Sequence, residues 1–573
     1  MKHRLGWAAV LLAALVLSAA GFYRWPLSSA FIASQIGARS WPAGIVMRGP
    51  GRASLSILPM PTLRLLDAEW DGPGGAPVVT AQRADIRLRA TALIAGRIEP
   101  AAVVLRQPTA FIDLDAQAAA PAKPRGNSGD WPAELTFQQG LIHLSSAVRQ
   151  IDELIGDVEG TLSYAGPGGA WGGNLRATWR DEPLGIALEF GQPAQGANSA
   201  TAASLSLASD KAWIKFDGDV MNNAALQGSV SAALPASTPL KRLFGLADDR
   251  FVPLQDIALE GELSASTASI QLTQAHLLIG DQSFEGALTL QLNAARPALA
   301  GTLAGDELNL DKFFASAPDA FDASGGWSDA PLTLPWLPAA DVDLRISATR
   351  VTWRGRHLDN SAAELAGRNG VWTLSLLEAG AYKGLLKGEV TLARQGSGLG
   401  LRVSATISNT DVGVLLGEFG VSALTGQGGG EMALHTEGSS PAELVRGLKG
   451  EALVHLTDGA IEGVSFEEAL RRSLRRSIIP ASDMRMGRTV FADASARFKI
   501  VDGTAQILAA SLNGPGVNIG ADGAVDLVKR RIDARIVALQ TDSGGAPTAD
   551  GPRLTFDLTG PWMAPAVAPG SGG

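Results

Sequence analysis

The residues best suited to chemistry are few and scattered. Two carboxylate pairs, Asp217/Asp219 and Asp341/Asp343, have the i, i+2 spacing that places both side chains on one face of a strand. Paired carboxylates can act as general acid and base, but here the alternating pattern around them favours a solvated sheet surface. The glycines of 514–520 are spaced GxGxxxG between predicted strands, which favours a tight hairpin over a dinucleotide-binding loop.

Histidine and cysteine usage restricts the chemistry further. The chain has no cysteine and six histidines, so thiolate zinc sites, disulfides and cysteine nucleophiles are excluded. No two histidines lie three or four residues apart; His435 and His455 fall in neighbouring predicted strands, where a solvated position is favoured over a metal site. Walker A, HExxH and GxSxG motifs are absent. We therefore predict a protein that is not an enzyme, with no catalytic, cofactor-binding or metal-binding residues.

One cluster of arginines is a candidate binding site. It lies within a chain of net charge −9 and has a single acid, Asp483, in its local stretch. Two interpretations stay open: a solvated helix face, or a contact with anionic head groups or a partner protein. The cluster consists of Arg471, Arg472, Arg475, Arg476, Arg485 and Arg488.

The elements that carry these residues are mostly strands. Stretches such as 84–90 (ADIRLRA) and 401–407 (LRVSATI) alternate between apolar and polar residues, which predicts strands with one apolar and one wet face. Roughly 25–30 such strands recur along the 573 residues. The predicted fold class is mainly β, with a long antiparallel sheet and a few short helices.

Turn and helix signals divide the strands. Glycine and aspartate at 157, 160, 218, 219, 261, 286, 458, 459, 502, 503, 522 and 523 are interpreted as turns. Helices are predicted at 28–39, 238–247 and 309–316, at 441–450 after the capping residue Ser440, and from Ser465 to about Ile478.

So many amphipathic strands must cover their apolar faces. Two arrangements stay open: several sandwiches of face-to-face sheets, or one sheet curled so that its apolar face lines a groove. A groove would suit acyl chains, because each CH₂ kept from water is worth about 0.8 kcal/mol. The candidate lining residues are Ile86, Leu88, Ile214, Phe216, Leu288, Leu290, Ile346, Val403, Ile407 and Ile536.

The N-terminus predicts a membrane anchor. Residues 5–22 carry no charge, follow Lys2 and Arg4, and in a helix would reach roughly 27 Å, just enough for a bilayer core. A cleaved signal peptide ending near Ala20 is the alternative. In either case we expect the body to lie in the periplasm. If the segment is retained, we expect it to attach the body to the inner membrane by a single pass. The acidic charge argues against nucleic acid as a partner.

The order of motifs resembles the AsmA family. At the N-terminal end the similarity lies in 35–39 (QIGAR), 58–63 (LPMPTL), 92–100 (ALIAGRIEP) and 105–108 (LRQP); at the far end it lies in 438–444, 448–450, 458–463, 498–503 and 512–527. The middle of the chain is similar only in its general pattern and carries no specific motif of the family. The resemblance implies an inner-membrane-anchored periplasmic protein with a hydrophobic groove, linked to phospholipid movement and outer-membrane assembly, and without catalytic residues.

Together these observations predict six segments: an anchor (1–27), an N-terminal AsmA-like β segment (28–115), an Ala/Pro linker (116–131), a central β-groove region (132–399), a C-terminal AsmA-like region (400–540), and a last strand with a loose tail (541–573). The main hypothesis is a conduit for phospholipid, with a further partner on the outer-membrane side. The alternative is an assembly factor that pairs its exposed strand edges with outer-membrane proteins. An envelope hydrolase is disfavoured by the missing motifs.

Overall fold

The computed structural model describes most of the chain. Before Val46 it describes residues 12, 15, 16, 18–30 and 32. From 46 to 570 it describes all residues except 73–76, 96–98, 114–131, 147–150, 167–168, 193–198, 210–211, 222–224, 236–255, 293–295, 315–318, 333–340, 396–397, 418–422, 474–486, 543–547 and 549–550. The chain divides into two units: unit 1 is Met1–Asp248 with Gln255–Gly280, and unit 2 is Asp249–Leu254 with Asp281–Gly573. The division falls inside the predicted central region 132–399.

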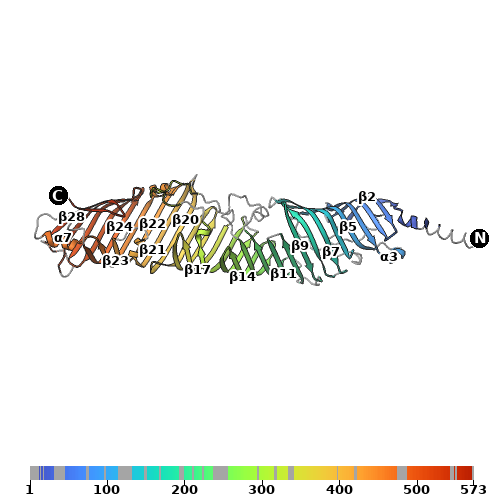
Figure 1. Ribbon diagram of the computed structural model, residues 1–573, viewed down its shortest axis with the longest axis horizontal. Coiled ribbons are helices and arrows are strands. Elements are labelled where there is room, and N and C mark those ends of the chain that lie inside the picture. Colours follow the sequence, from blue (N-terminus) through green and yellow to red (C-terminus); the bar gives the residue numbers. More distant parts are fainter. Residues whose placement is uncertain are drawn as a thin grey trace, which may run out of the picture. The chain divides into compact units, whose positions relative to one another are not determined.

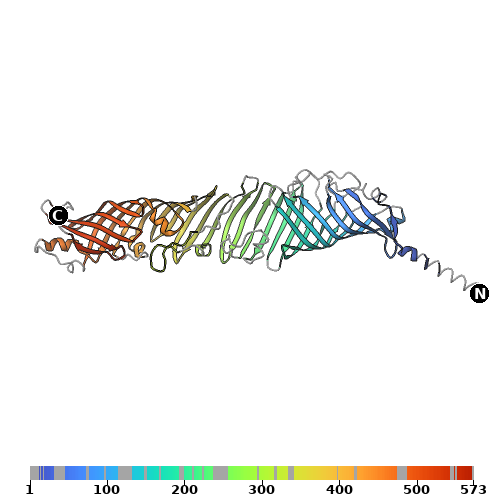
Figure 2. The ribbon, with the colours of Figure 1, turned by 90° about the horizontal axis from the view of Figure 1, so that it is seen from above.

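Unit 1 is an open ladder of strands that pair in chain order (Figures 1 and 2). All described junctions are antiparallel except β5–β6, which is parallel. A short helix, α3 (Ala90–Ile94), joins β4 to β5. The strands are β1 (Trp25–Leu27), β2 (Val46–Ser56), β3 (Thr62–Asp71), β4 (Pro77–Leu88), β5 (Pro100–Asp113), β6 (Glu134–Ser146), β7 (Ile151–Tyr164), β8 (Trp171–Trp179), β9 (Glu182–Phe190), β10 (Ala200–Ala208), β11 (Trp213–Met221), β12 (Leu226–Leu234), β13 (Ile257–Ala265) and β14 (Ser269–Ile279).

Unit 2 repeats this plan, with one parallel junction, β16–β17. Its strands are β15 (Gln282–Gln291), β16 (Ala298–Asn309), β17 (Asp341–Trp353), β18 (Arg356–Arg368), β19 (Val371–Ala381), β20 (Gly384–Gln395), β21 (Gly398–Asp411), β22 (Leu424–Gly438), β23 (Lys449–Glu462), β24 (Arg488–Val501), β25 (Thr504–Gly514), β26 (Val517–Asp526), β27 (Arg531–Gln540), β28 (Arg553–Pro561) and β29 (Ala566–Pro569). Its helices are η2 (Leu310–Lys312), α5 (Val412–Gly417), α6 (Pro441–Arg446) and α7 (Phe466–Ser473).

The predicted mainly β class is confirmed, and the described residues form 29 strands, within the expected range. Each unit is a single-layer ladder whose strands pair in chain order, which is not the arrangement of a two-sheet sandwich. Within the described residues, the first and last strands of each ladder do not pair with each other, so neither ladder closes. The open, curled sheet therefore describes each unit better than the sandwich alternative.

Most of the glycines and aspartates interpreted as turns lie inside strands instead, which corrects that prediction. Asp502–Gly503 does turn between β24 and β25, and 515–516 form the predicted tight hairpin. Gly218 and Gly228, however, face each other across β11 and β12, and a Cβ on either would come within 2.3 Å of a backbone oxygen of the opposite strand. These glycines allow a close approach between strands, and the strands are longer than predicted.

The helix predictions have mixed outcomes. Ser440 caps α6 by accepting a hydrogen bond from the Glu443 N–H at 3.3 Å, as predicted, although the helix is followed by Gly447 and Gly450 lies in β23. The helix after Ser465 is confirmed as α7 as far as Ser473, beyond which the chain is outside the described residues. The expected helix at 309–316 is reduced to η2. Residues 238–247, the linker 116–131 and most of 28–39 also lie outside the described residues.

Two further predictions concern the ends of the chain. In the described part of the chain, no helix is long and apolar enough to cross a bilayer; the predicted span at 5–22 falls mostly outside the described residues. At the other end, the segment predicted as a loose tail contains β29, which pairs with Phe556–Thr559 of β28. Part of the tail is therefore an edge strand.

A cluster of charged side chains near the end of β4, Arg64, Arg83 and Asp85, stabilises the polar face of unit 1. Asp85 accepts a hydrogen bond from Arg64 Nε at 2.8 Å, and its Oδ2 lies 2.7 Å from Nη2 of Arg83. Burial disfavours the ionised form of Asp85, but the hydrogen bonds and positive charges of Arg83 and Arg64 outweigh it. The pKa of the Asp85 carboxyl is therefore held below its ordinary value.

This shift predicts an acid-sensitive contribution to stability. Because the folded-state pKa of Asp85 is lower than its unfolded value of about 3.9, the contribution is complete above that value and is lost as pH falls through the folded pKa. We expect Asp85→Asn to lower the free energy of unfolding at neutral pH, and the difference from wild type to shrink below about pH 4. Urea unfolding of both chains across this range checks it; a difference that stays constant at every pH would contradict the role.

Candidate apolar groove

The strand registers place apolar residues opposite one another from strand to strand. Directly opposite residues project from the same face of a sheet, so a run of such partners forms a row across the strands. In unit 1 the row is Leu55, Leu63, Ile86, Val103, Leu135, Leu162, Gly173, Leu188, Leu205, Phe216, Val230 and Gly261. The row continues through the parallel junction β5–β6 without a polar side chain.

Unit 2 carries an equivalent row. It comprises Leu288, Gly301, Leu344, Leu365, Leu374, Val390, Val403, Leu434, Gly450, Ile500, Ala505, Val525, Ile532 and Gly560. Residues two positions away along each strand share its face. The neighbouring positions, such as Thr406 and Lys387, form the polar face.

The ten predicted lining residues all lie on these apolar faces. Ile86, Phe216, Leu288 and Val403 are in the rows themselves, and the other six are two or four residues away on the same strands. Ile407 and Ile536 also line a cavity in unit 2. The registers therefore place all ten on apolar faces, but the residues differ in what covers them.

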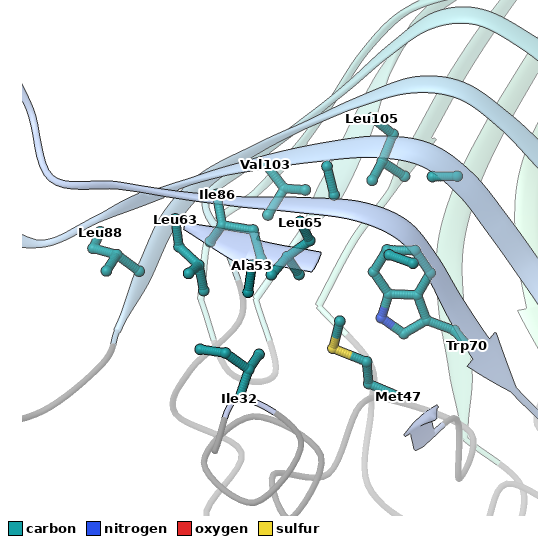
Figure 3. Packing of buried hydrophobic residues seen from close by; sticks show 13 residues of the cluster. Ile32, Met47, Ala53, Leu63, Leu65, Trp70, Ile86, Leu88, Val103 and Leu105 are labelled. Carbon is teal, nitrogen blue, oxygen red and sulfur yellow. The ribbon is translucent and has the colours of Figure 1, made fainter. Parts of the chain in front are cut away.

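The apolar face of unit 1 is filled at its N-terminal end. Ile32, from the segment before β2, is fully buried against Leu63, Leu65, Ile86 and neighbouring side chains of β2–β5 (Figure 3). Leu88 belongs to the same cluster. Ile86 and Leu88 therefore pack a closed end. From β6 onward the members of the row are only partly buried, apart from Phe216 on β11.

Unit 2 is filled at its C-terminal end by α7. Phe466 on this helix is 2% exposed and packs edge-to-face on Phe556 of β28, with ring centroids 5.2 Å apart. Leu470, one turn later, is also buried against β24–β28. Ser465 caps the helix by accepting a hydrogen bond from the Glu468 N–H at 3.3 Å. The helix thus covers the apolar face where the ladder ends.

Next to α7, which we call the plug of unit 2, lies a cavity of about 730 Å³. This volume is within the range of roughly 300–1,000 Å³ usual for small-molecule sites. It is bounded by β20–β27 and by α5 and α7, and its lining is predominantly apolar. Met432 and Val454, on the apolar face there, are 42% and 36% exposed. Farther along the same face, Leu374 of β19 is 44% exposed. The apolar face of unit 2 is therefore accessible beside the plug rather than filled.

The helix α5 (Val412–Gly417) is a part of this site that was not predicted from the sequence. It follows β21 directly, and Leu415 and Leu416 on it line the cavity. Asp411 accepts a hydrogen bond from the Val414 N–H at 3.3 Å and so holds the start of the helix. The signal was present as Asp411 followed by the apolar run Val-Gly-Val-Leu-Leu.

The described arginines of the basic cluster are divided between two sites. Arg471 and Arg472 on α7 both pair with Glu468, Arg472 at 2.7 Å, and the hydrogen bond from Arg472 is the main cause of the lowered pKa of Glu468. Arg488 begins β24 and pairs with Glu462 of β23 at 3.2 Å. Arg475, Arg476 and Arg485 lie outside the described residues. Head-group binding by these arginines stays a prediction.

The polar pairs that suggested chemistry are not brought into the groove. His435 and His455 lie on neighbouring strands, but His455 pairs with Gly429, six residues from His435 and so roughly 20 Å along the strand. In the part of the chain that the structure describes, no cluster of three metal-ligating side chains occurs. The site offers an apolar surface without an evident reacting group.

The fold and the site define a class of protein built from open β-ladders whose curled apolar face is partly accessible. Residues 248–509 match the family model of the AsmA family, which confirms the family assignment made from the sequence. The match includes the later part of the central region, from 248 to 399, where no specific motif carried the resemblance, and the far-end motifs up to 503; the motif at 512–527 lies beyond it. The N-terminal motifs lie outside it. The searches of curated proteins and of solved structures found no match.

Proposed function

We propose that this protein is a non-enzymatic carrier of phospholipid between the inner and outer membranes, anchored in the inner membrane with its body in the periplasm. Acyl chains would lie along the apolar rows while head groups stay in water at the groove margin. A groove lowers the barrier to transfer because each CH₂ kept from water is worth about 0.8 kcal/mol. AsmA family membership is consistent with a function in the cell envelope.

The observation that carries this proposal is the accessible apolar face of unit 2. Contiguous accessible apolar surfaces are uncommon on soluble proteins and mark binding sites, and here Met432 and Val454 are partly exposed among the apolar side chains that line a cavity of about 730 Å³. A partner at the outer-membrane side would receive the lipid. The anchor is supported by Leu12, Leu15 and Val16, which are helical and more than half exposed, as side chains inside a bilayer would be in the absence of lipid.

A charge placed in the cavity tests the proposal. Met432→Arg puts a guanidinium among acyl-chain contacts, where desolvation disfavours it, and we expect a large loss of phospholipid that co-purifies with the full chain. Thr406→Arg is the matched control, because Thr406 is exposed on the polar face of the neighbouring strand β21. Quantitative lipid mass spectrometry of wild type and both variants provides the measurement. Equal phospholipid content in all three, with equal melting temperatures, would contradict the proposal.

A further inference from the structure

The N-terminal edge of unit 1 exposes a set of large apolar side chains that the groove does not use. We call this set the rim patch: Phe22, Tyr23, Trp25, Ile57, Met60 and Ile94. Ile94 is 88% exposed and Met60 is 61% exposed. On α3, Leu93 packs against the buried cluster of unit 1 while the next residue, Ile94, is left in solvent. Single exposed apolar residues are ordinary, but a group of six marks a contact surface.

Hydrogen bonds and strand pairing bring these residues to one edge of the sheet. The Ile57 and Leu58 N–H groups donate to the Gly21 carbonyl at 3.0 and 2.8 Å, which joins the β2–β3 turn to the helical residues before Phe22. Trp25 pairs with Leu55, next to the same turn. The Leu88 N–H donates to the Pro61 carbonyl at 2.8 Å, so α3 leaves the sheet at that turn as well. The patch is therefore built from three segments that meet at this edge of the sheet.

The composition of the rim patch fits a membrane interface. Tyr23 and Trp25 pack edge-to-face at 5.1 Å, and amphipathic rings of this kind concentrate where a bilayer meets water. The flanking exposed charges include three arginines, Arg24, Arg87 and Arg89. The nearby acids are Asp85, which bonds to Arg64, and Glu99, which is half-buried. Arginines beside an apolar surface are complementary to anionic phospholipid.

We infer that the rim patch is a second membrane contact: it lies in the head-group region of a phospholipid bilayer and holds this end of unit 1 against the leaflet. The inference rests on the proposed anchor, because the helical residues Leu12, Leu15 and Val16 belong to the segment that precedes the patch in the chain. Since Ile32 and its neighbours fill the apolar face at β2–β5, lipid entering from this leaflet would reach the open part of the face from the side, at β6 or beyond.

Single-cysteine variants test this inference, because the chain has no cysteine of its own. Met60→Cys, Ile94→Cys, Leu12→Cys and Asn174→Cys would each carry one environment-sensitive fluorophore on the full chain, reconstituted into vesicles of phosphatidylcholine and phosphatidylglycerol. Leu12 reports on the anchor, and Asn174 is an exposed control on the polar face of β8. Residues 60 and 94 are exposed, so their labelling should leave the melting temperature unchanged.

We expect nitroxide lipids labelled near the head group to quench the probes at 60 and 94 more strongly than lipids labelled at the chain end, as for side chains about 5–10 Å deep in the interface. The probe at 174 should not be quenched. Quenching at 12 without quenching at 60 and 94 overturns the rim contact and leaves the anchor. Quenching at 60 and 94 without quenching at 12 supports the rim contact and overturns the anchor. No quenching at any of these three positions overturns both. A blue shift at 60 and 94 without lipid quenching indicates a protein contact and also overturns the inference.

Discussion

Replacing Phe466 with alanine is expected to lower the free energy of unfolding of unit 2 by about 3–5 kcal/mol. The side chain is almost fully buried, packs on Phe556, and forms part of the cavity wall. Its removal takes away buried apolar area and leaves a void that the rigid strands around it cannot close. Urea unfolding, followed by circular dichroism, gives the change in free energy.

Val490→Ala is the matched control for Phe466→Ala. Val490 lies on β24 near the same plug but is about half exposed, so its truncation should have a much smaller effect. Comparable losses for the two variants would contradict the view that α7 closes the end of unit 2 by packing. Phe466→Leu should fall between wild type and Phe466→Ala, because most of the buried volume is kept.

Gly450→Ala is expected to be the second large effect, lowering the free energy of unfolding by about 2–5 kcal/mol. Gly450 is in the apolar row of unit 2, between Leu434 and Ile500, and has a φ of +146°. A Cβ there would lie 2.0 Å from the Ala433 backbone oxygen. Both the backbone conformation and the close approach of the strands exclude a side chain. Urea unfolding of the variant and of wild type measures the effect.

Variants at two other glycines separate the effect of the positive φ from the effect of the close strand approach. Gly355→Ala tests backbone conformation alone, because Gly355 has a φ of +76° and a Cβ added to it would have no atom within 4 Å. Gly520→Ala tests neither cause, because the nearest atom to its Cβ would be 3.8 Å away and its φ is not in the left-handed region. We expect an order of Gly450→Ala, then Gly355→Ala, then Gly520→Ala. A Gly450→Ala chain as stable as Gly520→Ala would show that the strands can move apart at low cost.

The strands could be predicted because alternation with period two leaves a strong local signal. Segments such as 213–218 and 401–407 specify both the strand and its apolar face, and the registers place their apolar residues opposite those of the neighbouring strands. The positions of glycines predicted the local structure less well. The same residue marks a turn at Gly503 and a close strand contact at Gly450, and the difference depends on the partner strand, which local sequence does not reveal.

The candidate site was predictable only in part. The face on which Ile86 and Ile407 lie follows from local pattern, but whether that face is filled or open depends on distant segments. Ile32 covers the first, whereas the second lines an accessible cavity. The parallel junctions likewise depend on connections of many residues. By contrast, the pairing of Glu468 with Arg471 and Arg472 was foreseeable from the i, i+3 and i, i+4 spacing.

Photocrosslinking from neighbouring residues on opposite faces of the same strand tests most directly whether the apolar face carries acyl chains. A photoreactive amino acid would be placed in the full chain at Ile214 and Ile407 on the apolar faces, and at the adjacent polar-face positions Lys215 and Thr406. After irradiation in cells, mass spectrometry of the purified protein would identify attached lipids. Phospholipid adducts at 214 and 407, with little at 215 and 406, are the predicted result. Equal adducts at all four positions, or none at 214 and 407, would contradict the carrier function.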